Sequence, residues 1–147
     1  MFVGAEECIG CHDEEGERWR GSYHDRSMQV AKPGTVLGRF DGSILRRFDE
    51  TWRFVREEAD FFVEYETAGR PVERLRVTHT FGFEPLQQFL VSVSGGRKQA
   101  LPVAWDSRPE AEGGQRWFGL QPGEPTPPGD PLHWKGLAYN WNSQCAS

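Results

Sequence analysis

The chain has few cysteines, no long apolar segment and no excess of positive charge. It contains three cysteines in 147 residues, and its formal net charge at pH 7 is −5. The negative charge argues against nucleic acid as a partner, because binding to a phosphate backbone depends on lysine and arginine. No apolar run approaches the length of a membrane span, so the sequence predicts no such span in this chain. The length corresponds to one domain with a substantial core, and we expect residues 1–147 to form it.

Two of the three cysteines, Cys8 and Cys11, are three positions apart, and His12 follows directly. This C-x-x-C-H pattern is the attachment signature of a c-type haem. The two thiols can form thioethers with the two vinyl groups on one edge of the porphyrin, and the adjacent histidine can bind the iron. We therefore predict a covalently attached haem c, with His12 as the proximal ligand.

Three other uses of a C-x-x-C pair are a redox dithiol, half of a zinc site and a structural disulfide. A thioredoxin-type dithiol needs a βαβ context, and no strand precedes Cys8. A structural zinc site needs two more ligands, usually a second close pair, and the remaining cysteine, Cys145, is far away in the sequence. These absences favour haem attachment.

The C-terminal residues Cys145-Ala146-Ser147 match the first three positions of another C-x-x-C-H pattern. Two interpretations remain open. A stray terminal cysteine is the one that the residues alone favour. Our hypothesis is that the natural protein continues with Cys-His, so that this polypeptide ends inside a second haem motif.

The stretch from Cys8 to Met28 resembles the opening of multihaem c-type cytochromes, in which a tryptophan and a Gly-Ser-x-His-x-x-x-Met segment follow the haem motif. Here these are Trp19 and Gly21-Ser22-Tyr23-His24-Asp25-Arg26-Ser27-Met28. The family is that of the tetrahaem cytochrome that accepts electrons from hydroxylamine oxidoreductase, including forms fused to tetratricopeptide repeats. Later matching segments are residues 80–90, 104–109, 113–118, 128–134 and 140–142.

The resemblance implies an N-terminal fragment of a multihaem cytochrome that transfers electrons between redox partner proteins. Its further partner would be the remainder of its own multihaem chain. Haem is attached to such proteins outside the cytoplasm, so we expect a periplasmic or other extracytoplasmic location. Met1 is followed at once by Phe2-Val3-Gly4-Ala5 with no signal peptide, and we expect the natural protein to have one.

The expected fold class is α+β. Short N-terminal haem-attachment helices (1–34) would precede an antiparallel β-sheet or meander (35–105) and a long Pro/Gly-rich ordered loop (106–147). A first helix would follow His12 to about Arg20, and Ser22 with Asp25 resembles a capping box that starts a second helix reaching about Ala31.

The strands are predicted from apolar residues that alternate with polar ones, as in residues 61–65 and 74–81. One helical turn is expected near Glu84-Pro85. Turn signals stand at Asp41-Gly42, Glu58-Ala59-Asp60, Ala68-Gly69-Arg70 and Gly95-Gly96.

The second axial ligand separates electron transfer from catalysis. His24 is the expected distal ligand, because it lies close to the motif and would share a helix face with Met28. Met28 and His133 are the alternatives, and a methionine would raise the reduction potential relative to a second histidine. His79 lies on an apolar strand face and is expected to be a core histidine.

Aromatic residues make up 13% of the chain, and they would suit either the lining of a haem or an aromatic-rich β core. Trp19 is expected to contact the haem or to belong to the core. We expect a six-coordinate electron-transfer module without catalytic residues of its own. The alternatives are a five-coordinate catalytic haem domain of an oxidoreductase and a haem-free β scaffold that binds another subunit.

Overall fold

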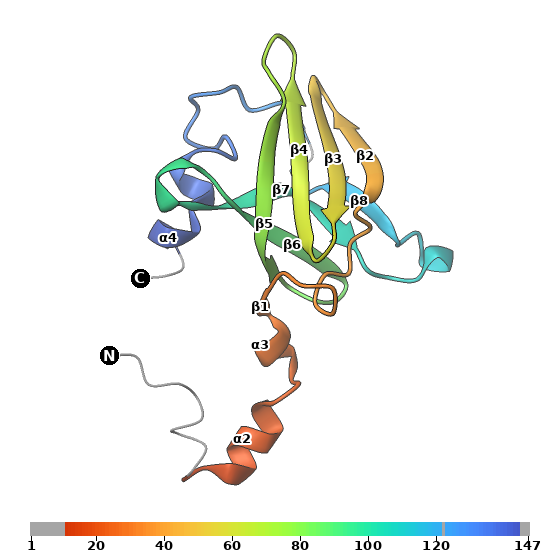
Figure 1. Cartoon of the computed structure of the whole chain (residues 1–147), viewed down its shortest axis with the longest axis vertical. Helices are drawn as coiled ribbons and strands as arrows, with labels where there is room; N and C mark the ends of the chain where they lie inside the picture. The colour runs from red at the N-terminus through yellow and green to blue at the C-terminus, as the bar shows by residue number, and fades with distance from the viewer. Residues whose placement is uncertain (1–10, 122, 145–147) are drawn as a thin grey trace.

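A nearly closed barrel of antiparallel strands forms the body of the protein (Figure 1). The computed structural model describes residues 11–121 and 123–144. From β2 to β8 each strand pairs with the next one in the chain, which makes a meander, and β1 pairs with β5 beside this path. The strands are β1 (Met28–Val30), β2 (Asp41–Arg47), β3 (Glu50–Glu57), β4 (Asp60–Thr67), β5 (Glu73–Phe81), β6 (Leu86–Ser92), β7 (Lys98–Asp106) and β8 (Arg116–Gly119).

The predicted α+β class is wrong, because the described helices are too short to form a layer. Helix α2 (Asp13–Trp19) has seven residues, and α3 (Tyr23–Arg26) and α4 (Trp141–Gln144) have four each. The expected meander is present, but β8 lies in the region predicted to be a loop. A strand of four residues is too short to show a clear alternation of apolar and polar side chains. The fold is therefore β-rich.

The two edge strands, β2 and β8, approach each other through side chains. The guanidinium of Arg47 donates a hydrogen bond to the backbone carbonyl of Gln121, just beyond β8. The indole Nε1–H of Trp117 on β8 donates to the carbonyl of Arg39, just before β2, at 3.0 Å. A Cβ at Gly119 would overlap the guanidinium end of Arg47, so a larger residue there would displace this side chain.

The interior of the barrel is filled by aromatic side chains. Trp117 stacks on Phe54 with parallel planes and ring centroids 3.5 Å apart. Phe40 packs edge-on against Phe54, Phe61, Phe89 and Trp117, with centroid distances of 5.1–5.7 Å. Edge-to-face contacts of this kind stabilise a core beyond the burial of apolar area. A large part of the aromatic content therefore belongs to a β core.

A second aromatic cluster joins the C-terminal segment to the barrel. Trp134 is buried and lies 5.3 Å from Trp52 on β3 and 5.1 Å from Tyr65 on β4, measured between ring centroids. The prediction that the Pro/Gly-rich segment is ordered around its tryptophans is consistent with this burial. Segments far apart in the sequence thus meet at the end of the barrel where β4 turns into β5.

The expected core position of His79 is wrong, because β5 contains a bulge. The pairing of β5 with β6 shifts register between Val77 and His79. An extra residue at a bulge reverses which side chains face inward. Leu75 and Val77 are buried, whereas beyond the bulge Thr80 is buried and Phe81 is 41% exposed. His79 is only half-buried, and its Nδ1 lies 3.2 Å from Nζ of Lys98.

Three of the four turn signals are confirmed, including the one without glycine. Glu58 and Ala59 form the β3–β4 turn, where Glu58 has φ +52°. Asp41-Gly42 instead begins β2 at a register shift. The β2–β3 turn lies at Phe48-Asp49, which carries no glycine signal. The helical turn expected near Glu84-Pro85 is absent from the described chain, since β6 begins there after a cis peptide bond.

Candidate functional site

The described part of the haem motif lies on an arm that extends away from the barrel (Figure 1). We call residues 11–27 the N-terminal arm. Cys8 lies outside the described residues, so its position relative to Cys11 remains a prediction. The side chain of Cys11 is exposed, and the residue directly precedes His12 at the start of α2. Both groups are therefore open to a large planar cofactor.

His12 is the N-cap residue of α2, and its side chain is 71% exposed. Its Nδ1 lies 4.0 Å from Oε2 of Glu15, one turn along the helix. An axial histidine normally directs its Nδ1–H toward an acceptor, which leaves Nε2 for the metal. At 4.0 Å Glu15 forms no such hydrogen bond here, and the nitrogens of the exposed His12 ring are open to a ligand.

The helices of the arm begin where the sequence predicts, but the second one is much shorter. The backbone N–H of Asp25 donates to Oγ of Ser22 at 3.2 Å, and Oδ2 of Asp25 accepts from the N–H of Gly21 at 2.8 Å. These bonds confirm the predicted N-terminal cap. Helix α3 nevertheless ends at Arg26, because residues 28–30 pair with β5. A single helical turn is too unstable to compete with sheet pairing.

His24 and Met28 do not share a helix face, and that prediction is wrong. Met28 is the first residue of β1, is half-buried and pairs with Phe81. His24 is exposed on α3, and no described residue forms a hydrogen bond with its ring. The imidazole of His24 is therefore available to a ligand, whereas Met28 is held in the sheet.

Trp19 is the last residue of α2 and is 43% exposed. It is not part of the buried core. The alternative that Trp19 is a core residue is therefore wrong, and its contact with haem stays a prediction.

His133 lies in a different part of the molecule, beside the β4–β5 connection. Only 6% of its surface is exposed. Its Nδ1 accepts a hydrogen bond from the backbone N–H of Lys135 at 3.2 Å. Since a backbone N–H can only donate, the neutral ring must carry its proton on Nε2. In this arrangement Nε2 has no lone pair for iron, so ligation by His133 would require the ring to turn and lose this bond.

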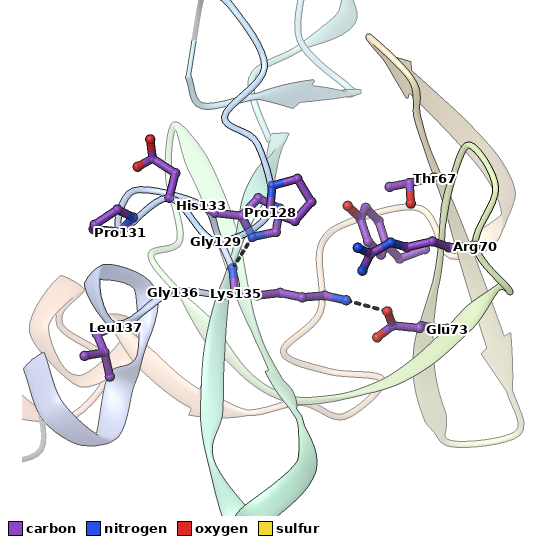
Figure 2. A pocket seen from close by; sticks show the side chains of 12 residues that line it. Thr67, Arg70, Glu73, Pro128, Gly129, Pro131, His133, Lys135, Gly136 and Leu137 are labelled. Atoms are coloured by element: carbon purple, nitrogen blue, oxygen red, sulfur yellow. Dashed lines mark hydrogen bonds and ion pairs between the residues drawn. The ribbon is translucent and has the colours of Figure 1, made fainter.

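His133 forms part of the wall of a surface hollow of about 480 Å³, which we call the polar hollow (Figure 2). Nζ of Lys135 pairs with the carboxylate of Glu73 and lies 5.0 Å from the ring centroid of Tyr65. The hydroxyl of Tyr65 donates to Glu50 at 2.9 Å. Burial raises the pKa of Tyr65 well above its ordinary value, so this hydroxyl keeps its proton at neutral pH.

The polar hollow was not predicted from the sequence. Its residues come from β4, the β4–β5 connection and the segment after β8, and only the fold brings them together. Among them, the sequence indicates only His133, as an alternative iron ligand. The other polar residues, such as Arg70 and Lys135, are of types that are common on any protein surface, and they belong to no motif. No local pattern could have indicated their convergence.

The free energy of unfolding should decrease as the pH falls from about 7.5 to 5. Burial lowers the pKa of His133. The negative charges of Glu50 and Asp130 oppose this shift and the positive charges of Lys135 and Arg70 add to it, with a net lowering. Burial also lowers the pKa of His79, and the positive charge of Lys98 lowers it further. Below about pH 6.5, the ordinary pKa of histidine, the unfolded chain therefore binds more protons than the folded chain, which favours unfolding.

Urea denaturation at the two pH values measures this effect. The substitution His133→Gln should reduce the loss of stability at acidic pH, and His79→Gln should reduce it further in the double variant. If the double variant keeps the full pH dependence, these histidines do not cause it.

No family model, curated protein or solved structure matches this chain. The resemblance to multihaem cytochromes therefore stays a prediction. In the described ranges, no helix has the length and apolar character needed to cross a membrane. Within the same residues, no group of three or more histidine, cysteine, aspartate or glutamate side chains could hold a metal ion. Cys145 lies outside the described residues.

Proposed function

We propose that this chain is a c-type cytochrome module that carries one covalently attached haem and transfers electrons. The observation that carries the proposal is the C-x-x-C-H motif, whose described half lies exposed on an arm outside the packed barrel. Haem attachment requires that both thiols and the following histidine can reach one edge and one face of the porphyrin. The exposure of Cys11 and His12 supports this access.

The donor set of the arm fits haem c. Cys8 and Cys11 would form the thioethers, and His12 would be the proximal ligand, with Glu15 near its Nδ1. The haem would supply a one-electron redox centre when bound.

His24 would be the second iron ligand in this proposal. Its exposed ring lies on the same arm as His12, and no described residue occupies its nitrogens. By contrast, Met28 is paired within the sheet and His133 has its proton on Nε2. Two histidine ligands would give a six-coordinate iron suited to electron transfer.

The barrel would act as the scaffold of this module. Its interior is filled by closely packed aromatic rings, and α2 extends beyond it (Figure 1). We place the module in the periplasm, as part of a multihaem cytochrome, because haem attachment takes place there. The net charge of −5 would favour encounters with basic redox partners.

The test is to export the full chain through a haem-attachment pathway and to record its intact mass and its oxidised and reduced absorption spectra. We expect the mass gain of one covalent haem and a low-spin reduced spectrum. Cys11→Ser should lose one of the two thioether bonds, with a much lower yield of haem-loaded protein. Cys145→Ser, the matched control, should keep the haem.

The outcomes separate the three functions. A high-spin spectrum in the unmodified chain would contradict the six-coordinate carrier and favour a catalytic haem. A correctly exported chain without haem would contradict the cytochrome proposal and favour a haem-free scaffold.

A further inference from the structure

The polar hollow contains hydrogen-bond donors that no acceptor in the described chain satisfies. The guanidinium of Arg70 has no carboxylate within ion-pair distance among the described residues. The hydroxyl of Thr67 forms no hydrogen bond there either. Figure 2 shows Arg70 and Thr67 on the side of the hollow opposite Pro128 and His133. The donors therefore face a common space.

His133 is the most informative of these donors, because it is buried. Its Nδ1 accepts from Lys135, so the neutral ring presents Nε2–H as a donor, and 94% of the residue is removed from solvent. No described residue accepts a hydrogen bond from Nε2. Nε2 is not itself sealed from solvent, since the fully buried unpaired side-chain atoms of the described residues are Oε1 of Gln99 and Nε1 of Trp134. An unpaired donor at the wall of a hollow is a position where a ligand atom can accept a hydrogen bond.

Two of the carboxylates around the polar hollow are engaged by side-chain donors, whereas Asp130 accepts from a backbone N–H and forms no ion pair among the described residues. Glu73 pairs with Lys135, and Glu50 accepts from Tyr65 and, at 3.3 Å, from Nε1 of Trp52. Oδ1 of Asp130 accepts from the backbone N–H of Leu132 at 2.8 Å. The positive charge of Arg70 is thus the one in this hollow without a partner in the described chain.

Apolar groups form the remaining wall. Pro128, Pro131 and Leu137 line the hollow, and Leu137 is 70% exposed. The volume of about 480 Å³ lies within the range that small organic ligands occupy in proteins.

We propose that the polar hollow binds a small molecule that carries an oxyanion group, either a carboxylate or a phosphate, on an apolar body. Arg70 would hold the oxyanion by charge-assisted hydrogen bonds, with Nε2–H of His133 and the hydroxyl of Thr67 as further donors. The apolar body would lie against the prolines and Leu137. This site goes beyond electron transfer and does not depend on the presence of haem.

The test is a titration of the full chain with benzoate, phenyl phosphate and the neutral analogue benzamide, followed by amide chemical shifts in NMR spectra. We expect at least one of the two anions to shift the resonances of residues around the hollow, such as Thr67, Lys135 and Gly136. Comparing the two anions identifies the preferred oxyanion. Benzamide should bind much more weakly.

Arg70→Gln should weaken the binding of that anion about 10- to 100-fold, because it removes a charged donor. Arg70 is exposed, so this variant should fold normally. The matched control is Arg116→Gln, which removes another exposed positive charge, on β8. It should bind like the unmodified chain. His133→Gln should also weaken binding, and it provides a second, independent substitution.

Three results would overturn the proposal. The first is that neither anion shifts the resonances of the hollow. The second is that benzamide binds as tightly as the anions. The third is that Arg70→Gln and Arg116→Gln weaken binding equally, which would indicate attraction by overall charge only.

Discussion

Replacing Trp117 by alanine is expected to lower the free energy of unfolding by about 3–5 kcal/mol. Trp117 stacks on Phe54 and contacts Phe40, Phe89 and Trp105 in the barrel interior. Its indole also donates the hydrogen bond to Arg39 that helps to close the barrel. The substitution would therefore create a large cavity and remove a contact between the two edges of the sheet.

Urea denaturation followed by circular dichroism measures this loss. The matched control is Trp19→Ala, which removes the same side chain from a position that is 43% exposed on the N-terminal arm. Surface substitutions of this kind change stability by about 0.5 kcal/mol or less in the protein without haem. Equal losses in the two variants would contradict the assignment of Trp117 to the core and of Trp19 to the arm.

Replacing His24 by alanine is expected to convert the haem-loaded protein from a low-spin to a high-spin spectrum. The proposal makes His24 the distal ligand, so its loss would leave the iron five-coordinate or bound to water. The covalent haem should remain, because Cys8, Cys11 and His12 are unchanged. The reduced absorption spectrum and the intact mass therefore give separate readings of ligation and attachment.

His133→Ala is the matched control for this spectrum. The ring of His133 is buried in the polar hollow and hydrogen-bonded to Lys135, so its removal should leave the low-spin spectrum unchanged. If His24→Ala stays low-spin while His133→Ala becomes high-spin, His133 is the ligand. If neither variant changes, the assignment passes to Met28.

Both experiments rely on the separation of the N-terminal arm from the barrel. The arm carries exposed chemical groups, and the barrel carries the buried aromatic core. Substitutions on the arm should therefore affect the cofactor with little effect on folding. Substitutions in the barrel interior should do the opposite.

Local interactions could be predicted from the sequence by itself, because they depend on neighbouring residues. The cap formed by Ser22 and Asp25, the turn at Gly95-Gly96 and the alternation along β4 all follow from short-range sterics and hydrogen bonding. The C-x-x-C-H motif is also local, and the haem hypothesis depends on it. The aromatic content suited either a haem lining or an aromatic β core, and the structure places a large part of it inside the barrel.

Only the tertiary structure decided which residues meet across the barrel. The end of α3 at Arg26 depends on the pairing of β1 with β5, and the outward turn of His79 depends on a bulge in β5. The burial of His133 beside the β4–β5 connection depends on the packing of Trp134 against Trp52 and Tyr65. These features arise from contacts between distant segments, whose energies outweigh local preferences and leave no periodic pattern in the sequence.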